Sequence, residues 1–295
     1  MLSSSSIVPP DRVVLAAADR RAAVIDVIRS ARRRLSLSLF RCNDKEIFRE
    51  LQAAVARGVD VEVLVTSRAK GGKKKLRKLW QRLENTGAVV HAYTDPVVKY
   101  HAKYVVADDG PALVASLNFT KKCFAKTCDA IVITHDPEVV HALRHLMASD
   151  RDGSAAPDSS AGRLILGPEG ARRQFTAVIR SARSSILLID AKLSDPDLLA
   201  LLDEQRAAGI AVHVHGDSRV GELKSHGKIM LIDGTRAFIG SLALTALSLD
   251  FRREVAIEVT HPAAVSDIQS LFRSIGVTTA EPGPVPAAAG GGASC

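Results

Sequence analysis

The chain contains an internal duplication, which restricts its possible folds more than any other feature of the sequence. The pentapeptide IRSAR at residues 28–32 recurs at residues 179–183, an offset of 151 positions. Residues 56–63 recur in looser form as residues 207–214, at the same offset. Because self-similarity at a fixed offset indicates a repeated structural unit, we expect two similar halves that pack against each other.

Each copy alternates helix-like and strand-like segments. The helix-like segments have apolar residues at intervals of three and four, and they are residues 18–32, 45–57, 169–183 and 196–208. The strand-like segments are short apolar runs, and they are residues 35–40, 61–66, 185–190 and 210–215. This alternation predicts an α/β fold with two duplicated α-β-α sandwich halves, each with a mixed β-sheet.

The composition between and beyond the copies indicates the domain boundaries. Small and polar residues fill the stretch 149–162, which we interpret as a linker between the halves. Residues 277–295 are rich in Pro, Gly and Ala and predict a disordered tail. We therefore expect the first half over 11–148 and the second over 163–276, after a flexible N-terminus of residues 1–10.

Polar residues recur at matched spacings in the two copies. Each copy has a histidine followed two residues later by a lysine, His101 with Lys103 and His226 with Lys228. The residues 7, 15 and 28 positions after each histidine also match; they are Asp108 and Asp233, Ser116 and Ser241, Asp129 and Glu254. On a strand, positions i and i+2 face one side, so each pair would share a face. We expect one composite site at the pseudo-two-fold interface, with a phosphate between two imidazoles.

The paired histidines and lysines suit phosphodiester cleavage. Histidine titrates near neutral pH, so two imidazoles can hold opposite protonation states. One can act as nucleophile while the other donates a proton to the leaving alkoxide. Lys103 and Lys228 would supply positive charge to the phosphoryl oxygens.

The other matched residues suit supporting roles. Asn118, Ser116 and Ser241 are candidate hydrogen-bond donors to the substrate. Asp129 and Glu254 are suited to accept the Nδ1 proton of an imidazole, which would fix its tautomer and orientation.

The motifs resemble a known signature. The first copy reads HAKYVVAD at 101–108 and ASLN at 115–118, and the second reads HGKIMLID at 226–233 and GSLA at 240–243. These residues resemble the His-x-Lys-x4-Asp and Gly/Ala-Ser-x-Asn signature of the phospholipase D superfamily, as in its bacterial phospholipase D-like and cardiolipin synthase-like phosphodiesterases. The resemblance covers both copies. It implies metal-independent hydrolysis or transfer through a phosphohistidine without a cofactor, with His101 as nucleophile and His226 as general acid.

The sequence departs from that signature at two positions. The counterpart of Asn118 in the second copy is Ala243, which removes one phosphate donor. Such a loss costs about ten- to a hundred-fold in rate unless another group, such as Thr245 or Ser248, substitutes. Asp129 stands where a glutamate is usual, and its side chain is one methylene shorter.

The motif aspartates have two interpretations. The resemblance groups Asp108 and Asp233 with the catalytic residues. Both come just before a glycine at the end of a predicted strand, so turn formation is a sufficient explanation for them. We favour a structural or supporting role over direct chemistry.

Positive charge is concentrated in one segment. The net charge is +8, and residues 68–82 contain eight basic residues and no acidic one. This run lies in a stretch that the second copy lacks, since that copy is 26 residues shorter before its histidine. The run favours polyanions, with Lys73, Lys74, Lys75 and Lys78 as candidate contacts. A solvated helix face is the commoner meaning of such a run.

Composition disfavours several protein classes. No window approaches the roughly 20 apolar residues of a membrane span, and the N-terminus does not resemble a signal peptide. The four cysteines show no paired framework or zinc-ligand pattern. We expect a cytoplasmic protein with no metal, and a monomer because both half-sites share one chain.

Three functions are compatible with the sequence. The first is a phospholipase D-type enzyme acting on phospholipids, peripheral to an anionic membrane, with Leu76, Trp80 and Leu83 of the basic helix resting on the bilayer. The second is a nuclease of the same superfamily. The third is a non-catalytic polyanion-binding module, which Ala243 motivates. We favour the first over the nuclease mostly because of the resemblance, and over the binding module because the second motif retains its other polar residues.

Overall fold

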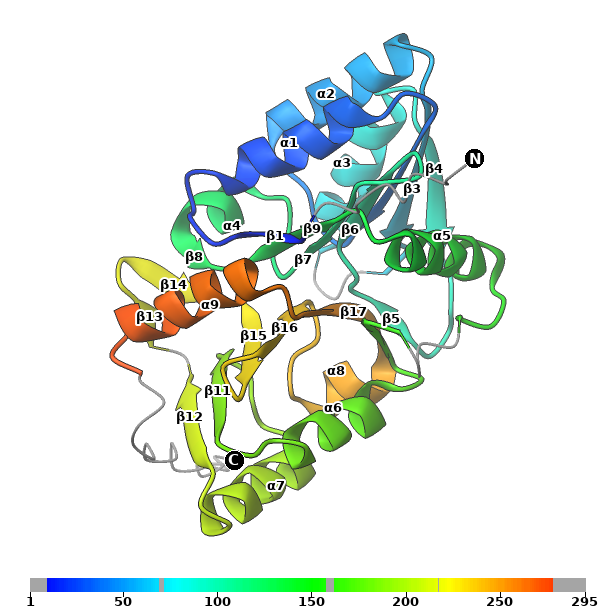
Figure 1. Ribbon diagram of the computed structural model, residues 1–295. Coiled ribbons are helices and arrows are strands. Elements are labelled where there is room, and N and C mark those ends of the chain that lie inside the picture. Colours follow the sequence, from blue (N-terminus) through cyan, green and yellow to red (C-terminus); the bar gives the residue numbers. More distant parts are fainter. Residues whose placement is uncertain (1–9, 69–71, 158–161, 217, 278–295) are drawn as a thin grey trace, which may run out of the picture.

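Two β-sheets with helices on both faces make up the molecule (Figure 1). The structure is a computed structural model that describes residues 10–68, 72–157, 162–216 and 218–277. The predicted tail, except for residue 277, lies outside the described residues, as does most of the predicted flexible N-terminus.

The two sheets have the same topology. The first has strand order β1-β9-β7-β6-β2-β3-β4, and the main path of the second is β10-β17-β16-β15-β11-β12. The strands of the first sheet are β1 (Arg12–Val14), β9 (Ile131–Thr134), β7 (Ala112–Ala115), β6 (Tyr104–Ala107), β2 (Arg34–Leu39), β3 (Asp60–Thr66) and β4 (Val89–Tyr93). Those of the second are β10 (Leu164–Gly167), β17 (Arg252–Val259), β16 (Arg236–Gly240), β15 (Lys228–Ile232), β11 (Ser185–Asp190) and β12 (Ala211–His215). The orders agree strand for strand except for β4, and both sheets are mixed, which confirms the predicted duplicated α/β fold.

Helices cover the outer faces of both sheets and fill the space between them (Figure 1). The outer helices are α1 (Arg20–Ser30), α2 (Lys45–Ala56) and α3 (Lys73–Glu84) on the first half, and α6 (Ala171–Arg180), α7 (Pro196–Ala207) and α8 (Ala246–Phe251) on the second. The inner helices are α5 (Pro137–Asp152) and α9 (Pro262–Ser274). Apolar side chains from both halves form one central core between the sheets, so the halves are fused rather than loosely linked.

The segment α3–β4 belongs to the first half alone. Leu79 and Leu83 of α3 are buried in the first core, and Leu76 and Trp80 pack partly against it. This spacing of three and four residues leaves the basic side chains on the other faces of the helix. The predicted contact of Leu83 with a bilayer is wrong, because the protein core buries this side chain completely. Leu76 and Trp80 pack partly against the core and keep some exposed surface.

Each half lends a short strand to the other. Strand β5 (Lys99–Tyr100) of the first half pairs in parallel with β17 of the second. Strand β14 (Leu223–Ser225) of the second half pairs in parallel with β8 (Thr127–Cys128) of the first, and β13 (Arg219–Val220) extends that ladder. These exchanged pairings come directly before the two histidines.

Two details differ from the sequence predictions. Helix α5 continues to Asp152, and its C-cap Gly153 has φ +70°, so the stop signal lies four residues inside the predicted linker. Asp150 is buried there and accepts from Arg253 Nε at 2.7 Å. The segment from His101 to Lys103 precedes β6 rather than lying within it, although Lys228 does begin β15.

Among the described residues, no helix combines the length and the apolar character needed to span a membrane.

Candidate active site

His101 is held by a carboxylate from the other half. Its N–H donates to the Arg253 carbonyl at 2.9 Å, which continues the β5–β17 pairing. Its Nδ1 lies 2.6 Å from Glu254 Oε1. The Glu254 side chain is fully buried, whereas 18% of the His101 side chain is exposed. Nδ1 is therefore occupied, and Nε2 is the ring nitrogen available to a substrate.

His226 is held in the same manner by Asp129. Its Nδ1 lies 2.9 Å and 3.1 Å from the two carboxylate oxygens of Asp129. The N–H of Gly227 donates to the Cys128 carbonyl at 2.7 Å, and a Cβ at Gly227 would stand only 2.9 Å from that oxygen. Glycine at this position thus permits the close approach, and the shorter Asp129 does reach an imidazole.

The ionised form of Asp129 is stabilised by four hydrogen-bond contacts. Ser116 Oγ donates to Oδ1 at 2.7 Å and Thr127 Oγ1 donates to Oδ2 at 2.6 Å, in addition to the contacts with His226. Burial acts to raise the pKa of Asp129, but the hydrogen bonds from His226, Thr127 and Ser116 outweigh it and hold the pKa below its ordinary value. This carboxylate is therefore anionic at neutral pH.

Glu254 has a different environment. It accepts from Ser248 Oγ, and the guanidinium of Arg252 lies 3.7 Å from Oε1. Burial raises the pKa of Glu254 to about 7, while Lys103 opposes this shift. The two carboxylates of the site therefore differ in charge state near neutral pH.

Both motif lysines are buried beside their histidines. Lys103 Nζ donates to the His101 carbonyl and lies 3.1 Å from its Nδ1, and Lys228 Nζ donates to the His226 carbonyl. Burial lowers the pKa of Lys103 to about 7, which Glu254 opposes. Burial and then the charge of Lys103 hold the pKa of His101 well below its ordinary value, so this imidazole is neutral at pH 7.

The predicted substrate contacts have separate outcomes. Asn118 Oδ1 is buried without a hydrogen-bond partner among the described residues. An amide oxygen accepts and cannot donate to a phosphate, so the predicted donor role falls to the amide Nδ2 and stays a prediction. The two serines are not free donors, because Ser116 donates to Asp129 and Ser241 exchanges hydrogen bonds with the backbone of Val255. Their predicted role in substrate binding is therefore wrong, since their hydroxyls support the site from within the protein.

The position of the missing asparagine is not filled by Ser248. Its hydroxyl accepts from the Ala243 N–H at 2.9 Å and donates to Glu254. Thr245 caps α8 by accepting from the Ser248 N–H. Ser248 thus substitutes as a partner of the carboxylate rather than as a phosphate donor.

The motif aspartates lie away from the histidines. Asp108 accepts from three consecutive backbone N–H groups of residues 32–34 at 2.8–2.9 Å, and Asp233 accepts from those of residues 183–185 at 2.8–3.1 Å. Both have left-handed φ, +41° and +52°. Seven residues of nearly extended chain, roughly 23 Å, separate each carboxylate from its histidine. Asp108 and Asp233 therefore have a structural role, as the turn interpretation favours, and their grouping with the catalytic residues is not supported.

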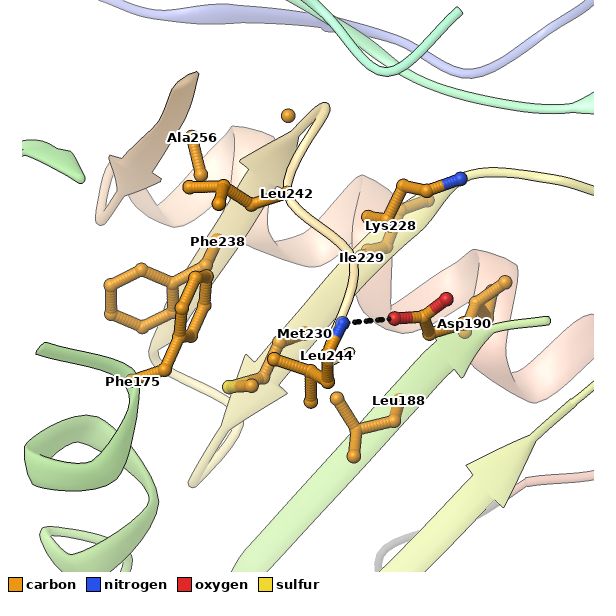
Figure 2. Close-up of a pocket in the computed structure, with 12 residues that line it drawn as sticks. Phe175, Leu188, Asp190, Lys228, Ile229, Met230, Phe238, Leu242, Leu244 and Ala256 are labelled. Carbon is orange, nitrogen blue, oxygen red and sulfur yellow. Dashed lines mark hydrogen bonds between the residues drawn. The ribbon is translucent and has the colours of Figure 1, made fainter. Parts of the chain in front are cut away.

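The fold brings further polar residues to the site that the motif spacing did not indicate. Arg252 and Lys192 both act electrostatically on His101. Asp190 is the register partner of Lys228 and accepts from the Leu244 N–H at 2.7 Å, at the edge of a small cavity of ≈ 20 Å³ (Figure 2). Lys192 lies 151 residues after Arg41, which is the offset of the duplication. The repeat alone could therefore have indicated a basic residue after β11.

Known proteins with similar sequence support this assignment of motifs. A family model described as "Cardiolipin synthase, PLD-like domain" matches residues 24–151 and 187–275. Cardiolipin synthase A of Pseudomonas putida (strain GB-1) is 28% identical over 127 residues, 43% of this chain and 26% of that protein. Cardiolipin synthase A of Pseudomonas entomophila (strain L48) is 29% identical over 129 residues, 43% and 27% of the two chains. The matched part spans about a quarter of the length of these relatives.

Solved structures share the fold. A polyphosphate kinase from Porphyromonas gingivalis aligns with TM-score 0.74 at 20% identity, over 89% of this chain and 46% of that one. The phosphatidylserine synthase of Haemophilus influenzae Rd KW20 aligns with TM-score 0.68 at 12% identity, over 90% and 86% of the two chains. At these identities the likeness concerns the fold. Since the family model covers most of both halves, the chain belongs to the cardiolipin synthase-type family of phospholipase D-like domains within the phospholipase D superfamily.

Proposed function

We propose that this protein is a phospholipase D-type enzyme that hydrolyses or transfers the phosphatidyl group of phospholipids through a phosphohistidine. The observation that carries the proposal is the crossed pair of dyads, in which each imidazole is oriented through Nδ1 by a buried carboxylate of the other half. Both Nε2 atoms are thereby free for a phosphoryl group at the interface. A purely structural histidine pair would not require two such buried carboxylates.

The first step forms the covalent intermediate. Nε2 of neutral His101 attacks the phosphorus, a P–N bond forms, and the P–O bond to the leaving alcohol breaks. His226 gives its Nε2 proton to the leaving alkoxide. The anionic Asp129 contacts Nδ1 of His226 and leaves Nε2 to carry the transferred proton, which supports the assignment of His226 as general acid.

The second step releases the phosphatidyl group. Neutral His226 removes a proton from water or from an acceptor alcohol, whose oxygen then attacks the phosphorus. The P–O bond forms, the P–N bond breaks, and His101 leaves as the neutral imidazole. Water as acceptor gives hydrolysis, and a lipid or small alcohol gives transfer.

In both steps, positively charged side chains would take the place of the water molecules that solvate the anionic phosphate. Lys103, Lys228 and Arg252 lie around the two histidines, and the amide Nδ2 of Asn118 would add a hydrogen-bond donor. Such preorganised groups stabilise the charge that develops on the non-bridging oxygens. Activity without added metal is an expectation of this arrangement.

A phospholipid substrate is supported by the relatives, which are named cardiolipin synthases, and by the basic α3. The exposed side chains of Lys73, Lys74 and Arg77 on this helix would attract an anionic membrane surface, so we propose peripheral contact with the bilayer. The same charges also suit a nucleic-acid backbone, which keeps a nuclease as the alternative.

Incubation with labelled substrates in EDTA tests the proposal. We expect turnover of phosphatidylglycerol vesicles, and a new phosphatidyl ester when a primary alcohol is added. Turnover of DNA or RNA alone would assign the nuclease function. Absence of turnover on every substrate, with no phosphohistidine after a rapid quench, would leave only a non-catalytic binding module.

A further inference from the structure

A basic pocket lies on the first half, next to the candidate active site. Residues from four segments line it: residues 40–43 after β2, Thr66 at the end of β3, helix α3 with its N-cap Gly72, and Thr120 and Lys122 at the start of α4 (Lys121–Lys126). Its volume is ≈ 520 Å³. Small-molecule sites in proteins occupy roughly 300–1,000 Å³, so the pocket has room for a phosphorylated group of glycerol size.

The lining of the basic pocket is cationic and carries no acidic residue. Its charged residues are Arg41, Lys75, Lys78, Arg82 and Lys122. In the part of the chain that the structure describes, none of these five forms an ion pair with a carboxylate; the guanidinium groups of Arg41 and Arg82 instead lie over the rings of Phe40 and Phe48. Five cations around one concave space repel one another, and an anion in that space would relieve the repulsion.

Only some of the basic side chains of helix α3 line the pocket. Lys75, Lys78 and Arg82 are spaced i, i+3 and i+7, which places them on one face of the helix. Lys73 and Lys74 are exposed and do not line the pocket. All four lysines are exposed, but only Lys75 and Lys78 line the pocket, a distinction that the sequence alone did not give.

Phe40 connects the basic pocket to the catalytic histidine. It lines the pocket, and its ring centroid lies 4.6 Å from that of His101. Lys103 Nζ lies 5.5 Å from the same ring. Only the ring of Phe40 therefore lies between the pocket and the proposed nucleophile. One substrate molecule, or two neighbouring lipids, can span this separation.

We propose that the basic pocket binds a second phosphate group while the reacting phosphate lies between His101 and His226. The mixed lining, with Leu76 and Leu79 beside the cations, suits the phosphate and glycerol of an anionic lipid headgroup rather than a bare nucleic-acid backbone. The second half lacks α3, so the site would occur once per chain. Phosphate binding in the basic pocket does not depend on the proposed function. Only the expected effect of this binding on turnover rests on it.

Fluorescence of the single tryptophan gives a local readout of the pocket. Trp80 lies on α3 next in sequence to the lining residue Leu79, although it packs against the core and is not itself part of the lining. We would titrate sn-glycerol 3-phosphate into the full-length chain, and separately add vesicles of phosphatidylglycerol or of phosphatidylcholine. The test variant is Lys75→Gln/Lys78→Gln. The matched control is Lys73→Gln/Lys74→Gln, which removes the same charge from the same helix outside the pocket.

We expect saturable binding of glycerol phosphate, weakened about tenfold or more in the test variant and unchanged in the control. Lys73 and Lys74 also attract a phosphatidylglycerol vesicle surface, so a vesicle response that falls further in the test variant than in the control identifies the lipid headgroup as a source of the phosphate. A response to glycerol phosphate alone identifies a soluble ligand. Equal loss of glycerol phosphate binding in both variants would refute the pocket as a specific site and indicate attraction by diffuse charge. Binding of a short DNA duplex in preference to glycerol phosphate would refute it in the same way.

The binding test does not depend on catalysis. The same titration on His101→Ala removes the proposed nucleophile while leaving the five cations in place. Saturable binding by His101→Ala and by the wild type, together with no turnover of any substrate by the wild type, would refute the proposed function but uphold the pocket. Normal turnover of the wild type without saturable binding of glycerol phosphate would refute the pocket alone.

Discussion

Nδ1 of His226 lies 2.9 Å from Asp129 Oδ1, and the two residues belong to different halves of the duplicated chain. The reciprocal contact joins His101 to Glu254. Neither half therefore contains a complete dyad, and the candidate active site requires both halves to be packed together. The exchanged strands β5 and β14 explain how the chain reaches this arrangement, since each leads directly into a histidine.

Replacing Asp129 by Asn should reduce kcat strongly. The amide would no longer stabilise the imidazolium of His226, and loss of such a carboxylate costs up to about 10⁴-fold in a comparable triad. We expect a loss of about 10²–10⁴-fold in kcat with a smaller change in KM. Asp109→Asn, at an exposed carboxylate paired with Arg33 and Arg34, is the control. Equal rates for Asp129→Asn and wild type would contradict the general-acid assignment of His226.

His226→Ala should trap the covalent intermediate. With a p-nitrophenyl phosphodiester the leaving group needs no protonation, so His101 can still attack, while the second step lacks its general base. Rapid acid-free quench and mass spectrometry should then show a phosphorylated His101 and a burst of one p-nitrophenol per chain. His101→Ala should show neither. The reverse pattern would mean that His226 is the nucleophile.

The rate should depend on pH in a narrow bell. Burial raises the pKa of Glu254 to about 7, and His101 needs the ionised form to accept its Nδ1 proton, so the rate rises with pH through that value. Burial lowers the pKa of Lys103 to about 7, and its loss of charge reduces the rate at higher pH. In Lys103→Arg the falling limb should move to higher pH, because arginine stays protonated. A flat profile of kcat/KM from pH 5 to 9 would exclude both assignments.

Asp108→Ala should destabilise the fold without altering the chemistry. The carboxylate accepts three backbone N–H bonds, and the residue has a left-handed φ that alanine adopts poorly. We expect a loss of about 2 kcal/mol in the free energy of unfolding, measured by urea titration. Asp108→Asn should lose less, since asparagine tolerates this φ and keeps one acceptor. A fall in kcat at full stability would instead support a catalytic aspartate.

Much of this protein follows from its sequence because the relevant signals are local. The apolar periodicity and the two repeated segments predict strands β2, β3, β11 and β12 and helices α1, α2, α6 and α7, since each element buries one face wherever it packs. The matched spacings identify His101, Lys103, His226 and Lys228 because the residue types themselves carry the chemistry. Gly153 also indicates in the sequence where α5 ends, although the predicted linker began too early.

Tertiary structure alone decided which groups meet. The partner of His226 lies 97 residues earlier in the chain, and spacing within a half carries no information on pairing between halves. The serines became internal supports because they are buried against Asp129 and Val255, and the aspartates became turn supports because a strand's length separates them from the imidazoles. Likewise, Lys75 and Lys78 differ from Lys73 and Lys74 only in the direction that α3 gives them once Leu79 and Leu83 enter the core.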